Sequence, residues 1–171
     1  MTTSDSLSVL FSPHGLVEAH IVSLIKTAQV RISMAAYAFT NQNIANAILD
    51  RLGKGVYVLM VMDKSQTHGQ QAKIHDQLTT AGAHVYLVSP PGGIMHDKFI
   101  VVDGTWVEWG SYNYTDRAEN NNFENATSIQ DTMFANKYDA ECHSIAGQGT
   151  PEVLGLRRPI HRFLRRLRFK L

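Results

Sequence analysis

The pattern of hydrophobic and polar positions along the chain predicts alternating strands and helices. Residues 30–37 alternate with a period of two, which is typical of a strand with one buried face. Residues 17–28 place their apolar side chains at helical spacing, which indicates an amphipathic helix. The run Val56–Met62 is apolar throughout and favours a central strand covered on both faces. We expect strands at residues 7–12, 30–37, 56–62, 84–88, 99–102, 105–109 and 126–130, and helices at 17–28, 40–51, 70–81 and 132–144.

This order of elements predicts an α/β domain with a mixed, largely parallel β-sheet flanked by α-helices. A helix between two strands acts as a crossover and allows them to run parallel. We place the domain at residues 1–146 and a linker at 147–156, because Gly147-Gln148-Gly149-Thr150-Pro151 is rich in residues that interrupt regular structure. Residues 157–171 have apolar positions on one arc of a helix and arginines on the remainder, which predicts a basic amphipathic helix.

One stretch has a spacing of polar residues that the hydrophobic pattern does not explain. It reads H-x-K-x4-D-x6-G-S-x-N and occurs once in the chain. Six fixed positions match by chance at roughly one in 10⁷–10⁸ starting points, so the pattern is specific. Its members are His96, Lys98, Asp103, Gly110, Ser111 and Asn113.

These residue types suit the cleavage of a phosphodiester. We expect His96 and Lys98 to point to the same face of a strand, because they are two residues apart. An imidazole nitrogen can attack phosphorus, while the ammonium group of Lys98 neutralises charge on the non-bridging oxygens. Ser111 and Asn113 can donate hydrogen bonds to the same oxygens. Asp103 follows the strand and is better placed to anchor its turn than to take part in chemistry.

The pattern resembles the signature of the phospholipase D superfamily. Further segments are similar to the single-motif bacterial endonucleases of that superfamily, and the resemblance covers about residues 7–130 without the basic tail. These segments are Phe11-Ser12-Pro13, Met34–Thr40, Gly55–Val58, Tyr112–Thr115 and Ala118–Asn125.

The resemblance implies a phospholipase-D-like fold and a phosphohistidine intermediate. It also implies catalysis without a metal or other cofactor, with Lys98 supplying the positive charge. In the family, an acidic residue in the N-x-E-N segment hydrogen-bonds the nucleophilic histidine, and that residue corresponds here to Glu124. Such a carboxylate fixes the tautomer of the imidazole and makes its other nitrogen a better nucleophile. The remaining histidines show no H-E-x-x-H or other metal-ligand spacing.

The formal net charge of +1 conceals an uneven distribution. The seven basic residues of 157–171 leave 9 basic and 15 acidic residues in 1–156, a net of −6. An acidic body is unlike a simple DNA-binding surface. The tail can pack on the body, bind nucleic acid or lie on an anionic membrane. Its candidate contacts to nucleic acid are Arg157, Arg158, Arg162, Arg165 and Arg166.

The chain has one cysteine, which rules out an intrachain disulfide, and no apolar run of the ~20 residues that span a bilayer. Its first residues lack the basic and apolar regions of a secretory signal, so we expect a cytoplasmic protein, or a periplasmic one whose leader was removed.

We interpret the chain as a metal-independent endonuclease that acts on DNA and, as a second substrate, RNA. Two alternatives stay open: a lipid phosphodiesterase that cleaves a phospholipid such as cardiolipin, and a non-catalytic module that binds phosphodiesters. In-line displacement needs a nucleophile and a general acid on opposite sides of phosphorus. With one signature per chain, we expect a homodimer in which two copies of His96 share one active site across a two-fold axis.

Overall fold

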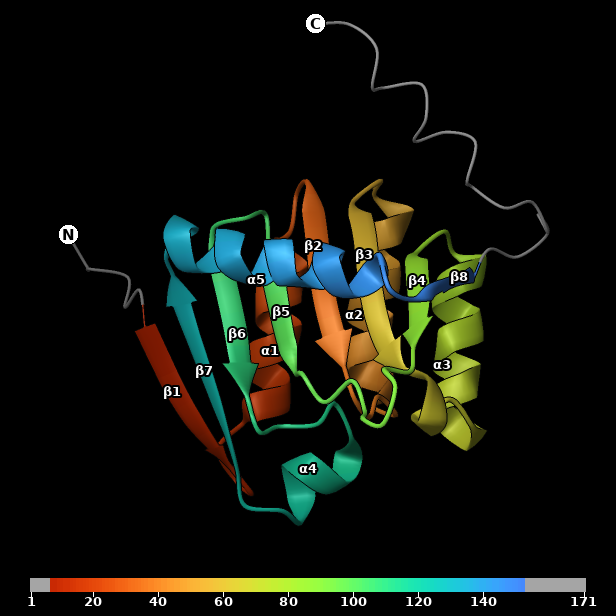
Figure 1. The fold of residues 1–171 in the computed structure, drawn as a ribbon. Coiled ribbons are helices and arrows are strands. Elements are labelled where there is room, and N and C mark those ends of the chain that lie inside the picture. Colours follow the sequence, from red (N-terminus) through yellow and green to blue (C-terminus); the bar gives the residue numbers. More distant parts are fainter. Residues whose placement is uncertain (1–6, 153–171) are drawn as a thin grey trace, which may run out of the picture.

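The computed structural model describes residues 7–152, which form one eight-stranded sheet with helices on both faces (Figure 1). The strands lie in the order β1-β7-β6-β5-β2-β3-β4-β8. Their bounds are β1 Leu7–Ser12, β2 Arg31–Ala36, β3 Tyr57–Asp63, β4 His84–Val88, β5 Phe99–Val102, β6 Trp106–Gly110, β7 Glu124–Gln130 and β8 Thr150–Glu152. The helices are α1 Val17–Thr27, α2 Gln42–Gly53, α3 Gly69–Thr80, α4 Asp116–Asn120 and α5 Thr132–Ala146, with a 3-10 turn at Lys64–Gln66.

The α/β class agrees with the sequence, but the expectation of a largely parallel sheet is wrong. The strands β2, β3 and β4 run parallel, because α2 and α3 provide the crossovers between them. The other five pairings are antiparallel. The chain passes from β4 to β5 without a helix and returns beside β2 in the opposite direction. A tight turn then joins β5 to β6, so this half of the sheet is antiparallel.

Two layers of apolar side chains sit on the two faces of the sheet. Helices α1, α2 and α3 cover one face, where residues such as Ile25, Ile48 and Met60 are fully buried. Helix α5 crosses the other face of the sheet alone (Figure 1), over residues that include Val61 and Val101. A single helix leaves part of this second face uncovered, and the candidate site lies in that part.

Several segments differ from the expected elements. Strand β5 begins at Phe99, so His96 and Lys98 lie in the preceding loop and not on the strand. Residues 150–152, within the predicted linker, form β8 at the edge of the sheet, antiparallel to β4. Helix α4 was not expected, because its five residues are too few to show a periodic pattern. The predicted basic helix at 157–171, with its five candidate arginines, lies outside the described residues.

Candidate active site

The loop that carries His96 is attached to the end of a neighbouring central strand. The backbone N–H of Met95 donates to Asp63 Oδ2 at 2.7 Å, and Asp63 is the last residue of β3. The other carboxylate oxygen of Asp63 accepts from the backbone N–H of Ser65 at 2.8 Å. Asp63 and Met95 are both buried. The buried carboxylate therefore fixes the backbone immediately before His96, although the loop has no regular hydrogen bonding of its own.

Lys98 and His96 share a single aromatic neighbour, Tyr37. The rings of Tyr37 and His96 are 4.8 Å apart between centroids, and Lys98 Nζ lies 5.3 Å from the centre of the Tyr37 ring. Lys98 Nζ also donates to the carbonyl oxygen of His96 at 2.6 Å. Burial lowers the pKa of Lys98, and the nearby carboxylates of Asp97 and Glu124 only partly oppose this. The ammonium group is thus desolvated and held beside the candidate nucleophile.

Ser111 and Asn113 follow the end of β6, as the sequence predicts. Ser111 Oγ donates to Glu124 Oε2 at 2.6 Å and accepts from the backbone N–H of Asn125 at 3.1 Å. The other carboxylate oxygen of Glu124 accepts from Asn122 Nδ2 at 2.9 Å. Asn113 Oδ1 is buried and has no hydrogen-bond partner among the described residues. The start of β7 therefore holds this part of the site in place.

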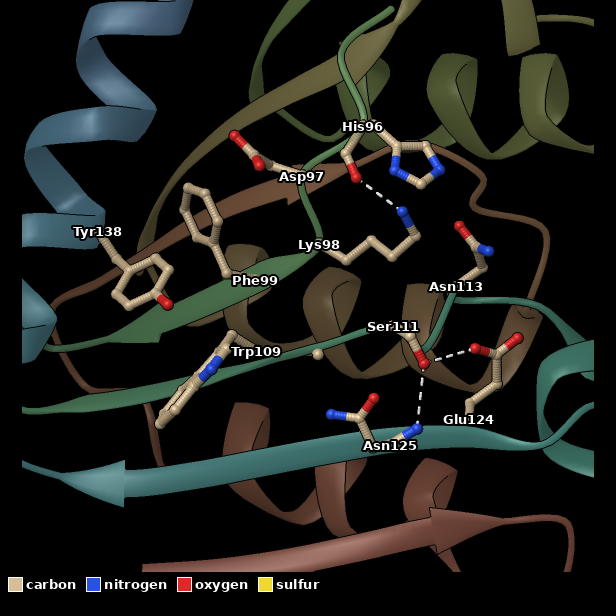
Figure 2. Close-up of a pocket in the computed structure, with 11 residues that line it drawn as sticks. His96, Asp97, Lys98, Phe99, Trp109, Ser111, Asn113, Glu124, Asn125 and Tyr138 are labelled. Atoms are coloured by element: carbon tan, nitrogen blue, oxygen red, sulfur yellow. Dashed lines mark hydrogen bonds between the residues drawn. The ribbon is translucent and has the colours of Figure 1, made fainter.

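These side chains meet in one pocket of about 570 Å³ (Figure 2). The volume falls in the range that is usual for small-molecule sites. The lining residues are His96, Asp97, Lys98, Phe99, Trp109, Gly110, Ser111, Asn113, Glu124, Asn125 and Tyr138. Of the six polar residues that the sequence analysis singles out, all but Asp103 line this pocket: His96, Lys98, Ser111, Asn113 and Glu124.

Glu124 lies in this pocket, but its contacts differ from those that the resemblance implies. The structure shows no hydrogen bond between Glu124 and His96 of the same chain, and the carboxylate is instead occupied by Ser111 and Asn122. The charge of Glu124 acts on the pKa of Lys98. Within one chain, Glu124 therefore orients Ser111 and does not fix the tautomer of His96.

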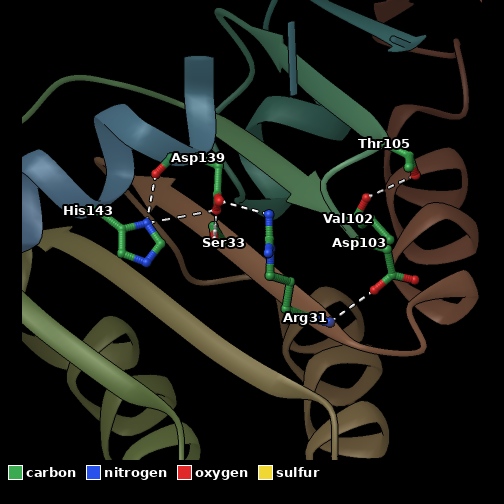
Figure 3. Close-up of polar contacts among 7 residues, drawn as sticks. All are labelled: Arg31, Ser33, Val102, Asp103, Thr105, Asp139 and His143. Atoms are coloured by element: carbon green, nitrogen blue, oxygen red, sulfur yellow. Dashed lines mark hydrogen bonds and ion pairs between the residues drawn. The ribbon is translucent and has the colours of Figure 1, made fainter. Parts of the chain in front are cut away.

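Asp103, the sixth candidate, lies at the other end of β5 and does not line the pocket. Its carboxylate accepts from the backbone N–H groups of Gln29 at 2.8 Å, Val30 at 2.8 Å and Arg31 at 2.9 Å (Figure 3 draws the last). Partial burial disfavours ionisation of Asp103, but these hydrogen bonds and the charge of Arg31 outweigh it and lower its pKa. Asp103 is thus a member of the signature but not of the pocket: it anchors the hairpin turn to the start of β2, the role that its place after the strand favoured.

Several residues at or next to the site were not identified from the sequence, among them Tyr37, Asp63 and Trp109. Tyr37 lies after β2 and Asp63 ends β3, and the two reach the loop of His96 only because β2 and β3 are neighbours in the sheet. The one available signal was the polar residue Asp63 at the end of an apolar run. Trp109 reads in sequence as an ordinary strand residue.

The described part of the chain contains no group of three or more His, Cys, Asp and Glu side chains arranged to hold a metal ion. None of the helices within residues 7–152 is both long and apolar enough to cross a membrane.

Comparisons with known proteins identify the family of the chain. Residues 21–146 match the family described as "Cardiolipin synthase, PLD-like domain". A phospholipase D of Rickettsia bellii is 33% identical over 134 residues, which are 78% of this chain and 66% of that protein. A mitochondrial cardiolipin hydrolase of Xenopus tropicalis is 31% identical over 123 residues, 72% of this chain and 58% of that protein. The chain thus spans somewhat less than two thirds of the length of these relatives.

The fold also matches solved structures. The phospholipase D family member Nuc of Salmonella typhimurium superposes with a TM-score of 0.82 at 32% identity, over 86% of this chain and 98% of that one. NucT of Helicobacter pylori has the same fold, with a TM-score of 0.75 at 24% identity, over 85% of this chain and 98% of that one. With the signature residues gathered in one pocket, these matches show that the chain belongs to the phospholipase D superfamily of phosphodiesterase-type enzymes.

Proposed function

We propose that the protein is an endonuclease that cleaves DNA, with RNA as a second substrate, through a phosphohistidine intermediate and without a metal. The observation that carries the proposal is the grouping of His96, Lys98, Ser111 and Asn113 in one pocket. In the first step a His96 nitrogen forms a bond to phosphorus, and the bond from phosphorus to the leaving oxygen breaks. A second imidazolium gives its proton to that oxygen. Water then attacks phosphorus, and the bond between phosphorus and the His96 nitrogen breaks. The proton of the water returns to the second imidazole.

The surroundings of Lys98 support a role in stabilising the transition state. An ammonium group in a partly desolvated site interacts with developing negative charge more strongly than one in water. Lys98 is mostly buried, and its depressed pKa records the cost of that position. A phosphate bound at the pocket would recover this cost. The amide of Asn113 would add a neutral donor, and Ser111 would add a second by turning its O–H from Glu124 to the phosphate.

We also propose that the active form is a homodimer with one site shared across a two-fold axis. The proton donor needs a second histidine, and within one chain His96 is the histidine that lines the pocket. Large apolar residues next to the site are exposed: Phe123 at 94%, Phe11 at 62% and Ile94 at 50%. Phe123 directly precedes Glu124, Phe11 pairs with Asn125, and Ile94 lies two residues before His96. A second copy placed over the pocket would bury them.

The main alternative is a lipid phosphodiesterase. Phosphodiester chemistry is common to both substrates, and relatives of this chain are named phospholipase D and mitochondrial cardiolipin hydrolase. The same exposed residues, Phe123 and Ile94, could insert into a bilayer instead of an interface between copies. The nuclease and the lipid phosphodiesterase would therefore use the same catalytic residues. They would differ in what covers the mouth of the pocket, which is a second copy of the chain in one case and a bilayer in the other.

One experiment separates these activities. The full chain is incubated with plasmid, single-stranded DNA, RNA and cardiolipin vesicles, with and without excess EDTA, and with His96→Ala as the control for contaminating enzymes. We expect degradation of nucleic acid that survives EDTA and is lost in the variant. Activity that disappears in EDTA and returns with magnesium or zinc would contradict metal independence. Cleavage of cardiolipin alone would establish the lipid alternative.

A further inference from the structure

Trp109 stands in the pocket wall as part of an aromatic stack. Its ring lies 5.8 Å from that of Tyr138 and 6.3 Å from that of Phe134, at interplanar angles of 29° and 25°. Both partners come from α5, one helical turn apart, and Phe99 supports Tyr138 from the side at 5.1 Å. The indole ring is therefore braced from the side of α5 and held in one orientation.

The position of Trp109 relates it to the phosphate cradle. Trp109 and Ser111 both line the pocket, and by the rise of an extended chain they are about 7 Å apart. One nucleotide of an extended strand spans a comparable distance. In Figure 2 the Trp109 ring is seen edge-on, with Tyr138 on one side and Asn125 and Ser111 towards the other. The face turned away from Tyr138 is on the side of Asn125 and Ser111, which also line the pocket.

Charge alone would hold a polyanion poorly at this site. Among the pocket-lining residues of the part of the chain that the structure describes, Lys98 is the only lysine or arginine, while Asp97 and Glu124 are acidic. Residues 1–156 as a whole carry a net charge of −6. Nucleic-acid affinity otherwise comes largely from phosphate contacts with basic side chains. Stacking of bases on aromatic rings is the other general source of affinity for single strands, and it does not depend on sequence.

We propose that Trp109 is the platform on which a base next to the scissile phosphate stacks, and that it makes single-stranded nucleic acid the preferred substrate. In a duplex both faces of each base are already stacked, so a base must leave the helix before it can reach Trp109. A lipid headgroup has no aromatic face to offer. The inference rests on the proposed nuclease function and names the residue that would distinguish nucleic acid from other phosphodiesters.

The test measures binding by the full chain carrying His96→Ala, so that the substrate is not consumed. Two fluorescently labelled oligomers of equal length are titrated, one of deoxythymidine and one of abasic sites with the same phosphates. Trp109→Leu should weaken binding of the thymidine oligomer roughly 5- to 100-fold and change that of the abasic oligomer less than about twofold. Trp109→Phe keeps an aromatic face and should retain most of the affinity.

Trp106→Phe is the matched control, because Trp106 lies on the same strand and packs on the opposite face of the sheet. It should leave both affinities unchanged. It also leaves Trp109 as the only tryptophan, whose fluorescence should be quenched by the thymidine oligomer and not by the abasic one. Melting temperatures of all variants check that Trp109→Leu is folded.

Two results would overturn the platform. One is an equal loss of affinity for both oligomers in Trp109→Leu, and the other is no loss for either while the protein still cleaves DNA. Failure of the proposed function has a different signature. In that case the chain with His96 intact cleaves no nucleic acid, whichever residue occupies position 109.

Discussion

Lys98 Nζ donates a hydrogen bond to the carbonyl oxygen of His96 at 2.6 Å. The cation and the candidate nucleophile are thus linked through the backbone and are not two independent side chains. A phosphate that binds between them would offer better acceptors than this carbonyl, and the ammonium group could turn to it with little movement. The geometry predicts that His96 and Lys98 are each required for turnover of the substrate.

His96→Ala and Lys98→Ala should each reduce turnover by at least about 10³-fold, because one removes the nucleophile and the other its charge partner. Both variants should keep the melting temperature of the wild type within a few degrees. Lys98→Arg is the matched control: it keeps the charge but changes the shape of the donor, so partial activity is expected. Substantial turnover in His96→Ala would exclude a phosphohistidine intermediate.

The rate should depend on pH in a bell-shaped manner. At low pH the nucleophilic imidazole is protonated and cannot attack. At high pH both the proton-donating imidazole and Lys98 lose their protons. Burial lowers the pKa of Lys98. The charge of Lys98 therefore supports catalysis below this pKa and is lost at a lower pH than the charge of a free lysine. Profiles of kcat/KM for wild type and Lys98→Arg measure this, since the arginine stays charged. A rate that rises steadily into the alkaline range would indicate attack by hydroxide instead.

Asp103→Asn should cost stability and leave chemistry nearly unchanged. An amide group cannot accept from the backbone N–H groups of Gln29, Val30 and Arg31 together, because one of its two positions is a donor. We expect a loss of about 1–3 kcal/mol in the free energy of unfolding. Denaturant melts give this quantity, and activity per folded molecule should stay within about twofold. A large loss of activity in a fully folded variant would instead give Asp103 a part in catalysis.

Mixed dimers test the shared site. Wild-type and His96→Ala chains are refolded together in equal amounts, so that random pairing makes about one quarter of the dimers fully wild type. If each dimer has one site that needs both histidines, total activity should be about one quarter of that of an equal amount of wild type. A value near one half, or full activity in a sedimenting monomer, would mean that each chain works alone.

Removal of residues 157–171 tests the basic tail. The remaining body has a net charge of −6, so nucleic-acid binding should weaken and its dependence on salt should become shallower. Binding isotherms at several salt concentrations measure this slope. An unchanged slope would indicate that the tail has no contact with phosphates. Loss of vesicle binding without any effect on DNA would favour a membrane role.

The sequence predicted the chemical groups of the site better than their surroundings. His96, Lys98, Ser111 and Asn113 lie within 18 residues and on two adjoining segments, so their linear spacing carries the geometry. Tyr37 follows β2 and Asp63 ends β3, and the two reach the site only through the order of strands in the sheet. The hydrophobic pattern showed where strands occur, but it contains no information on the direction in which β5 enters beside β2. The antiparallel half of the sheet was missed for that reason.

Glu124 shows a second limit. Its position in the pocket could be inferred from the resemblance, but its hydrogen-bond partner could not. The partner depends on which side chain lies closest once β6 and β7 are paired, and that side chain is Ser111. Residue identity therefore transfers more reliably between related chains than the contacts that the residue makes.

Gly110, the glycine of the signature, is required for a different reason from the polar residues around it. A Cβ atom at Gly110 would lie 2.1 Å from the carbonyl oxygen of Asn125, so any side chain there would push β7 away from β6. The close approach of the β6 and β7 backbones therefore requires glycine at this position. The requirement would persist in a descendant that had lost its enzymatic activity. In a survey of related chains, a retained glycine is evidence only of the fold. The presence of histidine, lysine and asparagine has to be assessed separately before an enzyme is inferred.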